Sequence, residues 1–352
     1  MGSKARIAVI GAGWWAAQNH IPVLKAHPDV TLTGICSIDR DSLRKVQAAY
    51  DIPFATEDFH ELLEREPLDG VIVSSPHVLH YEHARAAILK GYHVLVEKPF
   101  TTTADQALEL VELERRAAVS IVIPFGYNFS DMAHAAADWV RSGALGELRH
   151  AVLHMATPTR ELLLGHSLGA TRTHLLQPDP RTWADAARAG GFGWGQLCHA
   201  LGLLFMLVDD DPAVVFAATE RADSGVDLHD AAIVALRSGA VCAVSGSSGL
   251  VPGAASQLDL RLFGSGGTLA LDFEREQLVL HARGAPAPAA RTWPGSALYD
   301  GERPVRCFVD ICLGRPVLNP ATSLMGRRST EVLDAMYRSA TSACAESIPT
   351  ST

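Results

Sequence analysis

The first part of the chain alternates short apolar runs with helical stretches, and this alternation limits the fold more than any other feature. The runs between residues 5 and 127 are RIAVI, VTLTGIC, DGVIVSS, YHVLVE and SIVIPFGY. Helical patterns lie between them, around residues 14–26, 41–50, 79–90 and 104–117. Strands that are apolar throughout and are separated by helices are typical of a parallel sheet covered on both faces. We therefore predict a doubly wound α/β domain.

The pattern changes after Tyr127. A helical stretch over residues 131–142 is followed by runs such as HAVLHMA, AVVFAATE, AVCAVSGSS and LDLRLFG, with turn residues and few helices between them. Successive strands joined by short turns predict a mostly antiparallel, open sheet. We therefore expect two domains, residues 1–127 and an α+β domain of residues 128–352, whose final helix over about 327–344 could pack back on the first. The exposed face of the second sheet is a natural surface for a homo-oligomer.

Composition and charge exclude two classes of partner. The 352 residues are 48% hydrophobic and 20% charged, and the formal net charge is −9 with the Lys and Arg residues scattered. A chain without a basic stripe has no surface that neutralises successive phosphates, so nucleic acid is not an expected partner. No apolar run is long enough to cross a bilayer, and the chain enters a strand almost at once, without a signal-peptide layout. We expect a cytoplasmic protein without membrane attachment.

A glycine-rich turn follows the first predicted strand. In IAVIGAGWWA, Gly11, Gly13 and Ala16 stand at the mouth of the first helix, with Trp14 and Trp15 between them. Small residues at this spacing permit a tight turn and let the backbone approach a pyrophosphate, while the helix N-terminus attracts the phosphates. An ordinary glycine-rich turn is the alternative, but the position at the first strand of a βαβ series favours dinucleotide binding.

The end of the second predicted strand bears on which dinucleotide is bound. An acidic residue there would hydrogen-bond a ribose 2′-hydroxyl and repel a 2′-phosphate. The segment reads GICSIDRDS, with Ser37 at the expected end, Asp39 two residues later and Arg40 beside it. A serine with a nearby arginine favours NADP, whereas NAD is expected if Asp39 reaches back. We expect NADP, and the alternative for Arg40 is a solvated charge in the first helical turn.

The segment GYHVLVEKPF places a lysine where a strand leaves the core. Ligands of an open α/β sheet bind outside the carboxyl ends of the strands, so Lys98 is expected in the cofactor cleft. Pro99 restricts it to extended geometry and permits a cis bond, and Glu97 can hold it by charge. Oxidation of an alcohol releases a proton from oxygen, which an amine can accept where desolvation and a cationic nicotinamide disfavour its charged form. The alternative is a surface lysine paired with Glu97.

Three stretches together resemble the glucose-fructose oxidoreductase and inositol dehydrogenase family: GAGWWA, SSPHVLHYEHARAAILKGYHVLVEKPF and GYNFSDMAHAAADWVRSGALGELRH. The most specific part is the spacing of Glu97, Lys98 and Pro99 from Ser75, Pro76 and His80. The resemblance implies a Rossmann domain followed by a domain with a large open sheet, NAD(P)-dependent oxidation or reduction of sugars, cyclitols or their derivatives, and dimers or tetramers. It also implies that Lys98 contacts both nicotinamide and the substrate hydroxyl, in a cofactor site that includes Ser75, Pro76, His80 and Glu97.

A second family signature is matched only in part. In the family, a glycine-rich run precedes Asp-x-Gly-x-His, and the histidine faces the reacting hydroxyl. Here the run is AGGFGWGQLCHALGLLF, in which His199 matches the histidine, Gly195 stands at the aspartate position and Leu197 at the glycine. Because residues four apart share a helix face, an aspartate at 195 could have assisted His199, and a glycine cannot. This leaves Lys98 and His199 as the expected proton-handling pair, with Gln196 as a candidate hydrogen-bond donor to the substrate.

Further candidates lie near the predicted domain junction and beyond it. Asn128 could contact the cofactor and Tyr127 the nicotinamide end or the substrate, and the alternative is a hinge with a satisfied amide. Arg172 lies in a segment expected to reach over the cleft and could bind sugar hydroxyls. Trp183 and Trp194 could stack on a sugar face or pack in the core. No metal is expected, because the histidines near residue 80 lack a carboxylate or cysteine at matching spacing.

The sequence thus predicts an NAD(P)-dependent oxidoreductase acting on a small carbohydrate or polyol. Two alternatives remain open. The first is a nucleotide-binding sensor or regulatory protein without turnover. The glycine at the aspartate position, Gly195, is the feature that supports this alternative. The second is a sugar-cleaving enzyme that uses transient oxidation with tightly bound NAD.

Overall fold

The computed structural model describes residues 4–295 and 297–350, and these form two compact units. The first contains the described residues up to Pro124 together with Ser167–Thr182 and Gly301–Arg327. The second contains Phe125–His166, Trp183–Asp300 and the described residues from Arg328 onward. Two later segments of the chain therefore pack with the N-terminal unit.

The first unit is built on a six-stranded parallel sheet in the order β3-β2-β1-β4-β5-β6. The strands are β1 (Ala5–Ile10), β2 (Val30–Cys36), β3 (Ala55–Thr56), β4 (Gly70–Val73), β5 (His93–Val96) and β6 (Ile121–Val122). Every residue of β4 is buried, as expected for a sheet covered on both faces. The strand order reverses between β1 and β4, and ligands of doubly wound sheets bind at such a point.

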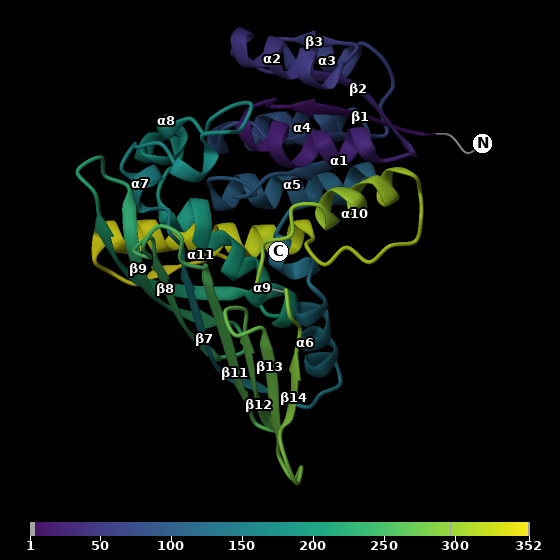
Figure 1. The fold of residues 1–352 in the computed structure, drawn as a ribbon. Coiled ribbons are helices and arrows are strands. Elements are labelled where there is room, and N and C mark those ends of the chain that lie inside the picture. Colours follow the sequence, from purple (N-terminus) through teal and green to yellow (C-terminus); the bar gives the residue numbers. More distant parts are fainter. Residues whose placement is uncertain (1–3, 296, 351–352) are drawn as a thin grey trace. The chain divides into compact units, whose positions relative to one another are not determined.

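Helices of the first unit flank this sheet, as Figure 1 shows for α1, α4 and α5. The helical elements are η1 (Ala16–His20), α1 (Ile21–Ala26), α2 (Arg40–Tyr50), α3 (Phe59–Glu64), η2 (His77–Leu79), α4 (His80–Leu89), α5 (Ala104–Ala117), η4 (Gly169–Thr171) and α10 (Arg303–Cys312). The short α8 (Pro180–Trp183) ends at the first residue of the second unit's middle segment. The predicted doubly wound α/β architecture is confirmed.

The second unit is built on a nine-stranded sheet in the order β14-β13-β12-β11-β7-β10-β9-β8-β15. Its strands are β7 (Leu148–Ala156), β8 (Pro212–Arg221), β9 (Asp227–Leu236), β10 (Val241–Ser247), β11 (Gln257–Gly264), β12 (Gly267–Asp272), β13 (Gln277–Ala282), β14 (Ala289–Thr292) and β15 (Glu346–Ser347). Neighbouring strands run antiparallel except for β7 and β10, which are parallel. The predicted large, mostly antiparallel sheet is confirmed.

Helices pack on one face of this second sheet, and α6 and α9 contact its strands β12, β13 and β7 (Figure 1). The helical elements are η3 (Gly126–Phe129), α6 (Asp131–Arg141), α7 (Arg160–Leu163), η5 (Ala186–Arg188), η6 (Gly193–Leu197) and α9 (Cys198–Leu207). The long helix α11 (Ser323–Ser342) begins before the predicted start at 327 and lies mostly in this unit. Burial alternates along strands such as β8, so the opposite sheet face is open.

Candidate active site

The two glycines of the turn after β1 have different surroundings. Gly11 has φ +90°, and a Cβ there would lie 2.3 Å from the backbone nitrogen of Ser75, so only glycine fits. Gly13 differs, because nothing lies within 4 Å of the place where its Cβ would be. Helical turns begin at Trp14, and Ala16 is fully buried against the sheet. The turn thus combines a close approach to the end of β4 with open space in front of a helix N-terminus, which suits a diphosphate.

A buried carboxylate lies at the end of β5, beside this turn. Trp15 donates its indole N–H to Oε1 of Glu97 at 2.7 Å, and Nε2 of His20 lies 2.8 Å from the same oxygen. The backbone N–H of Lys98 donates to Oε2 at 3.1 Å. Because a carboxylate can only accept, His20 must carry its hydrogen on Nε2. The network ties the first helix to the residue that precedes Lys98.

Glu97 keeps its charge despite its burial. It is 5% exposed, and desolvation alone would raise its pKa. The hydrogen bond from His20, with the charges of His20, Lys98 and His80, outweighs burial and holds the pKa of Glu97 below its ordinary value. The carboxylate of Glu97 is therefore a buried anion that is stabilised by His20, Lys98 and His80.

Lys98 is the second residue after β5, and it is buried, with 8% of its surface exposed. The Lys98–Pro99 bond is cis. His80 bridges this segment to the end of β4, since its Nδ1 lies 2.7 Å from the Pro99 carbonyl oxygen and its Nε2 lies 2.8 Å from that of Ser75. Burial lowers the pKa of His80, and the two carbonyl oxygens and Glu97 oppose that shift.

Ser37 and Asp39, the two candidates for contact with a ribose, differ in their surroundings. Strand β2 ends at Cys36, and the half-buried Ser37 follows it and donates its N–H to Thr56. Asp39 is the N-cap of α2, where its carboxylate accepts from the backbone N–H groups of Asp41 and Ser42. The Ser42 hydroxyl also donates to Asp39, and it lowers the pKa of Asp39. Helix capping therefore accounts for this acid.

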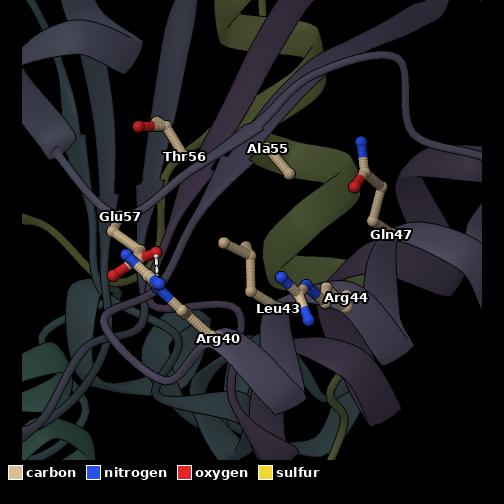
Figure 2. A pocket seen from close by; sticks show the side chains of 7 residues that line it. All are labelled: Arg40, Leu43, Arg44, Gln47, Ala55, Thr56 and Glu57. Carbon is tan, nitrogen blue, oxygen red and sulfur yellow. Dashed lines mark hydrogen bonds and ion pairs between the residues drawn. The ribbon is translucent and has the colours of Figure 1, made fainter.

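Arg40 lies one residue further, at the start of α2. Its guanidinium forms an ion pair with Glu57, and the two side chains face each other at the rim of a hollow of about 220 Å³ between α2 and the segment around β3 (Figure 2). Both side chains are well exposed, so the pair is open to water. The charge of Arg40 is thus paired with Glu57 at a solvent-exposed position at the start of α2.

Residues 167–182 pack with the first unit and contact its glycine turn, although they lie more than 150 residues later in the sequence. Trp14 donates its indole N–H to Nδ1 of His174 at 2.9 Å, and the two rings are nearly parallel, at 13°. Arg172 is exposed two residues earlier. This segment therefore brings His174 to the glycine turn of the first unit.

In the second unit, His199 lies on α9 and contacts three aromatic rings. It is 4% exposed, and the centroid of its ring lies 5.0 Å from that of Tyr299, 6.1 Å from that of Tyr127 and 6.2 Å from that of Phe125. Burial raises the pKa of Tyr127 to about 12, and a hydrogen bond with Ser256 opposes the rise. His199 is therefore held by ring packing in a dry environment.

Asn128 and Gln196 lie on η3 and η6, two elements that contact α9. Asn128 is fully buried, and its Nδ2 donates to the carbonyl oxygen of Gly202 at 3.1 Å, which fastens η3 to α9. Gln196 is half-buried in η6, three residues before His199. The amide of Gln196 is thus more accessible than that of Asn128.

Gly195 stands at the position of the family's aspartate, and a side chain from another segment occupies the space beside it. A Cβ on Gly195 would lie 2.8 Å from Cζ3 of Trp183, so the indole ring occupies the space that a side chain at 195 would need. Trp183 is half-buried, whereas Trp194 is 7% exposed and stacks on Tyr337. The absence of a carboxylate at 195 is therefore built into the packing of the second unit.

The candidate residues form two groups, one in each unit. The first unit contains Gly11, Gly13, Trp14, Trp15, Ala16, Ser37, Arg40, Ser75, Pro76, His80, Glu97, Lys98 and Arg172. The second contains Tyr127, Asn128, Gln196 and His199. Sequence reasoning missed His20, which binds Glu97, and Tyr299, which packs on His199. A histidine and a tyrosine in segments without a motif offered no signal for either.

Two profiles of one protein family match the chain. The profile described as "Oxidoreductase family, NAD-binding Rossmann fold" matches residues 5–125, and the profile described as "GFO/IDH/MocA C-terminal domain" matches residues 133–270. Together they cover most of the chain.

Curated relatives match over part of their length. A dTDP-3,4-didehydro-2,6-dideoxy-alpha-D-glucose 3-reductase of Streptomyces antibioticus is 35% identical over 150 residues, which are 42% of this chain and 44% of that protein. A D-xylose 1-dehydrogenase [NADP(+)] of Haloarcula marismortui is 26% identical over 218 residues, 60% of this chain and 57% of that protein. The chain thus spans less than two thirds of the length of these relatives.

Solved structures match along nearly the whole chain. The WlbA dehydrogenase from Bordetella pertussis, in complex with NADH and UDP-GlcNAcA, superposes with a TM-score of 0.80 at 18% identity and covers 99% of both chains. GenD2 from gentamicin A biosynthesis, in complex with NAD, gives 0.78 at 22% identity and covers 99% of this chain and 98% of its own. These likenesses establish the fold.

Proposed function

Because the chain belongs to the glucose-fructose oxidoreductase and inositol dehydrogenase family, we propose that it transfers a hydride between a nicotinamide coenzyme and a secondary or ring alcohol carbon of a sugar, cyclitol or sugar derivative. One observation carries the proposal. Lys98, 8% exposed, follows β5 at the carboxyl edge of the parallel sheet, where such sheets bind their ligands. Lysine is almost never fully buried unless it is paired. Glu97, the residue before Lys98, is buried as well.

The first unit would hold the coenzyme. Gly11 and Gly13 would seat the pyrophosphate with the N-terminal turn at Trp14, and Ser37 would meet the ribose. Trp15, Ser75, Pro76, His80 and Glu97 line the nicotinamide side in this proposal, with Asn128 from the second unit. When bound, the nicotinamide supplies a carbon that takes up or returns a hydride.

The chain's own groups would manage the proton of the substrate hydroxyl. An amine and an imidazole can each accept that proton during oxidation and return it during reduction. We assign these roles to Lys98 and His199. Gln196, Tyr127 and Arg172 would bind other substrate oxygens. Glu97 would orient Lys98, since it accepts the backbone N–H of Lys98 while Trp15 and His20 hold it from the helix side.

The test compares two lysine variants against a panel of sugars and polyols. Lys98→Ala should lower kcat by about 10²-fold or more and leave coenzyme affinity nearly intact. Lys90→Ala is the matched control, because Lys90 forms an exposed ion pair with Glu64 on the same unit. Turnover is followed by the absorbance of reduced nicotinamide, and affinity by protein fluorescence. Equal activity of the Lys98 variant and the wild type would refute the assignment.

The same assays separate the alternatives. Silence with every sugar, despite measurable coenzyme binding, would favour a sensor or regulatory protein. Nucleotide that is retained through purification and recycled without net reduction would favour a sugar-cleaving enzyme with transient oxidation. Mass spectrometry of the denatured protein detects such retained nucleotide.

We propose NADP rather than NAD as the preferred coenzyme. Asp39 is engaged in capping α2, so Ser37 is the residue at the strand end that would meet the ribose 2′-position. Arg40, exposed at the start of α2 and paired with Glu57, would turn its charge to the phosphate. Ser37→Asp should shift the ratio of the two affinities towards NAD by about tenfold or more, since a charge beside a phosphate is worth over ~1 kcal/mol. An unchanged ratio would place the ribose elsewhere.

We also propose a homo-oligomer that forms through the open face of the second sheet. Phe216 and Ile233 are cross-strand partners on that face and are 46% and 54% exposed. Apolar side chains gathered on one exposed face favour association. Ile233→Lys should shift the protein to a smaller species in light scattering after gel filtration. An unchanged mass would locate the interface elsewhere or show a monomer.

A further inference from the structure

The glycine-rich run before His199 packs on a buried acid from another strand. The backbone N–H of Gly193 donates to Oδ2 of Asp227 at 2.6 Å, and the hydroxyl of Tyr337 donates to Oδ1 at 2.7 Å. Asp227 begins β9 and is 1% exposed. The residue before η6, Phe192, contributes no side-chain cap. Asp227 therefore caps this helix from across the unit.

The glycines of the run permit this contact. Gly191 has φ +109°, and a Cβ there would lie 2.0 Å from Oδ1 of Asp227. A Cβ on Gly193 would lie 2.5 Å from the hydroxyl oxygen of Tyr337. That oxygen also accepts the N–H of Trp194 at 3.3 Å, and the two rings stack with centroids 5.3 Å apart. The run needs glycine because its backbone lies directly on the acid and the tyrosine.

A β-bulge places a second acid beside the first. Residues three apart on a regular strand point to opposite faces. Here Glu220 pairs with His229 but Arg221 pairs with Asp227, so β9 contains one extra residue at this point. The bulge turns Asp227 to the side of Asp230, and both are buried.

The surroundings of Asp230 favour the protonated form of its carboxyl group. Burial raises the pKa of Asp230 well above its ordinary value, the charge of Asp227 and the contact with its carboxyl group raise it further, and Arg221 on β8 opposes the shift. Burial and both aspartates also raise the pKa of Tyr337, which therefore stays a donor. Asp227 accepts the N–H of Gly193 at the first turn of the helix, where the helix dipole favours a carboxylate.

We propose that Asp227, held by Tyr337, is a positioning residue that sets the start and rotation of the helix at residues 193–207, and through it the placement of Gln196 and His199. The inference rests on the proposed function only in assigning His199 to the reaction. In this chain Trp183 excludes a side chain at 195, and Asp227 of β9 is the acid that contacts the start of the helix.

The experiment compares two variants on the same helix. Tyr337→Phe removes the donor to Asp227. Ser339→Ala is the control on the same helix, because Ser339 is buried on α11 but bonds to Ala217 and Cys344, away from the glycine run. With a sugar that the wild type oxidises, Tyr337→Phe should lower kcat about tenfold or more, since a small misplacement of a reacting group is costly. The Michaelis constant and coenzyme affinity should stay within about twofold.

Amide hydrogen exchange gives a readout that needs no turnover. Residues 193–199 should exchange faster in Tyr337→Phe and not in Ser339→Ala. Equal kcat and equal exchange in the two variants would overturn the inference. A wild type without turnover on any sugar would refute the proposed function, and the exchange comparison would still decide this one.

A further variant tests whether the carboxyl group of Asp230 is protonated in the folded protein. The folded pKa of Asp230 lies above the unfolded value of about 3.9, so the folded protein binds the extra proton and its stability falls as pH rises from that value through the folded pKa. Asp230→Asn is a neutral isostere of the protonated acid and should abolish this contribution to the slope. An unchanged dependence of the unfolding midpoint on pH would show that Asp230 carries no such proton.

Discussion

Replacing Glu97 by glutamine tests whether the buried anion organises the site. In the wild type Oε1 accepts from Trp15 and lies beside His20, and Oε2 accepts the N–H of Lys98. A glutamine keeps one oxygen, so its NH2 group must face at least one of these donors. One hydrogen bond to a charged acceptor is lost and a buried donor is left without an acceptor, which costs about 2 kcal/mol. For a unit of this size that lowers the unfolding midpoint by roughly 4–8 °C.

The pH dependence of this effect has a definite sign. The folded pKa of Glu97 is lowered, so the stability that its charge contributes is present above the unfolded value of about 4.3 and is lost as pH falls through the folded pKa. Thermal unfolding followed by circular dichroism should therefore show the largest difference between wild type and Glu97→Gln near neutral pH.

The control for this prediction is Glu64→Gln, which removes a carboxylate from an exposed ion pair with Lys90 in the same unit. Exposed pairs contribute at most about 1 kcal/mol, so this variant should unfold close to the wild type. The reasoning is refuted if Glu97→Gln unfolds at the same temperature as Glu64→Gln. It is also refuted if the loss from Glu97→Gln grows as the pH is lowered.

Two glycine substitutions give further predictions. Gly11→Ala should unfold or lose several degrees of thermal stability, because its φ is +90° and its Cβ would meet Ser75 at 2.3 Å, whereas Gly13→Ala, with open space, should keep its unfolding midpoint and bind coenzyme about tenfold more weakly. Gly195→Ala should cost about 1–3 kcal/mol in chemical denaturation through its clash with Trp183, and Trp183→Ala in the same chain should restore part of it. Additive effects of these two substitutions would show that the residues do not touch.

Much of the first unit could be predicted because its signals are local. The strand ending at Ile10 and the strand ending at Cys36 are each buried at all but one position, as expected for a sheet covered on both faces. Gly11 and Gly13 follow the first strand at the spacing that a phosphate turn needs. By contrast β3, of two residues, and α3, of six, are too short to show a period and were not predicted.

The helix that carries His199 shows where periodicity fails. Nine of the ten residues of α9 are buried, so no polar face alternates with an apolar one. A helix that is apolar on all sides cannot be told by its pattern from a buried strand. The helix was expected only through the resemblance of the run around it, and that comparison left the glycine at 195 without an explanation.

The sequence by itself determined five of the six strands of the parallel sheet, the glycine turn after the first strand and the lysine at the end of a strand, because each depends on residues that are neighbours along the chain. Only the tertiary structure decided which distant groups meet. It placed His174 on Trp14, the indole of Trp183 over Gly195, and Asp227 under Gly193. Such contacts form when elements pack, and a pair of residues far apart in sequence leaves no periodic trace before the chain brings the two together.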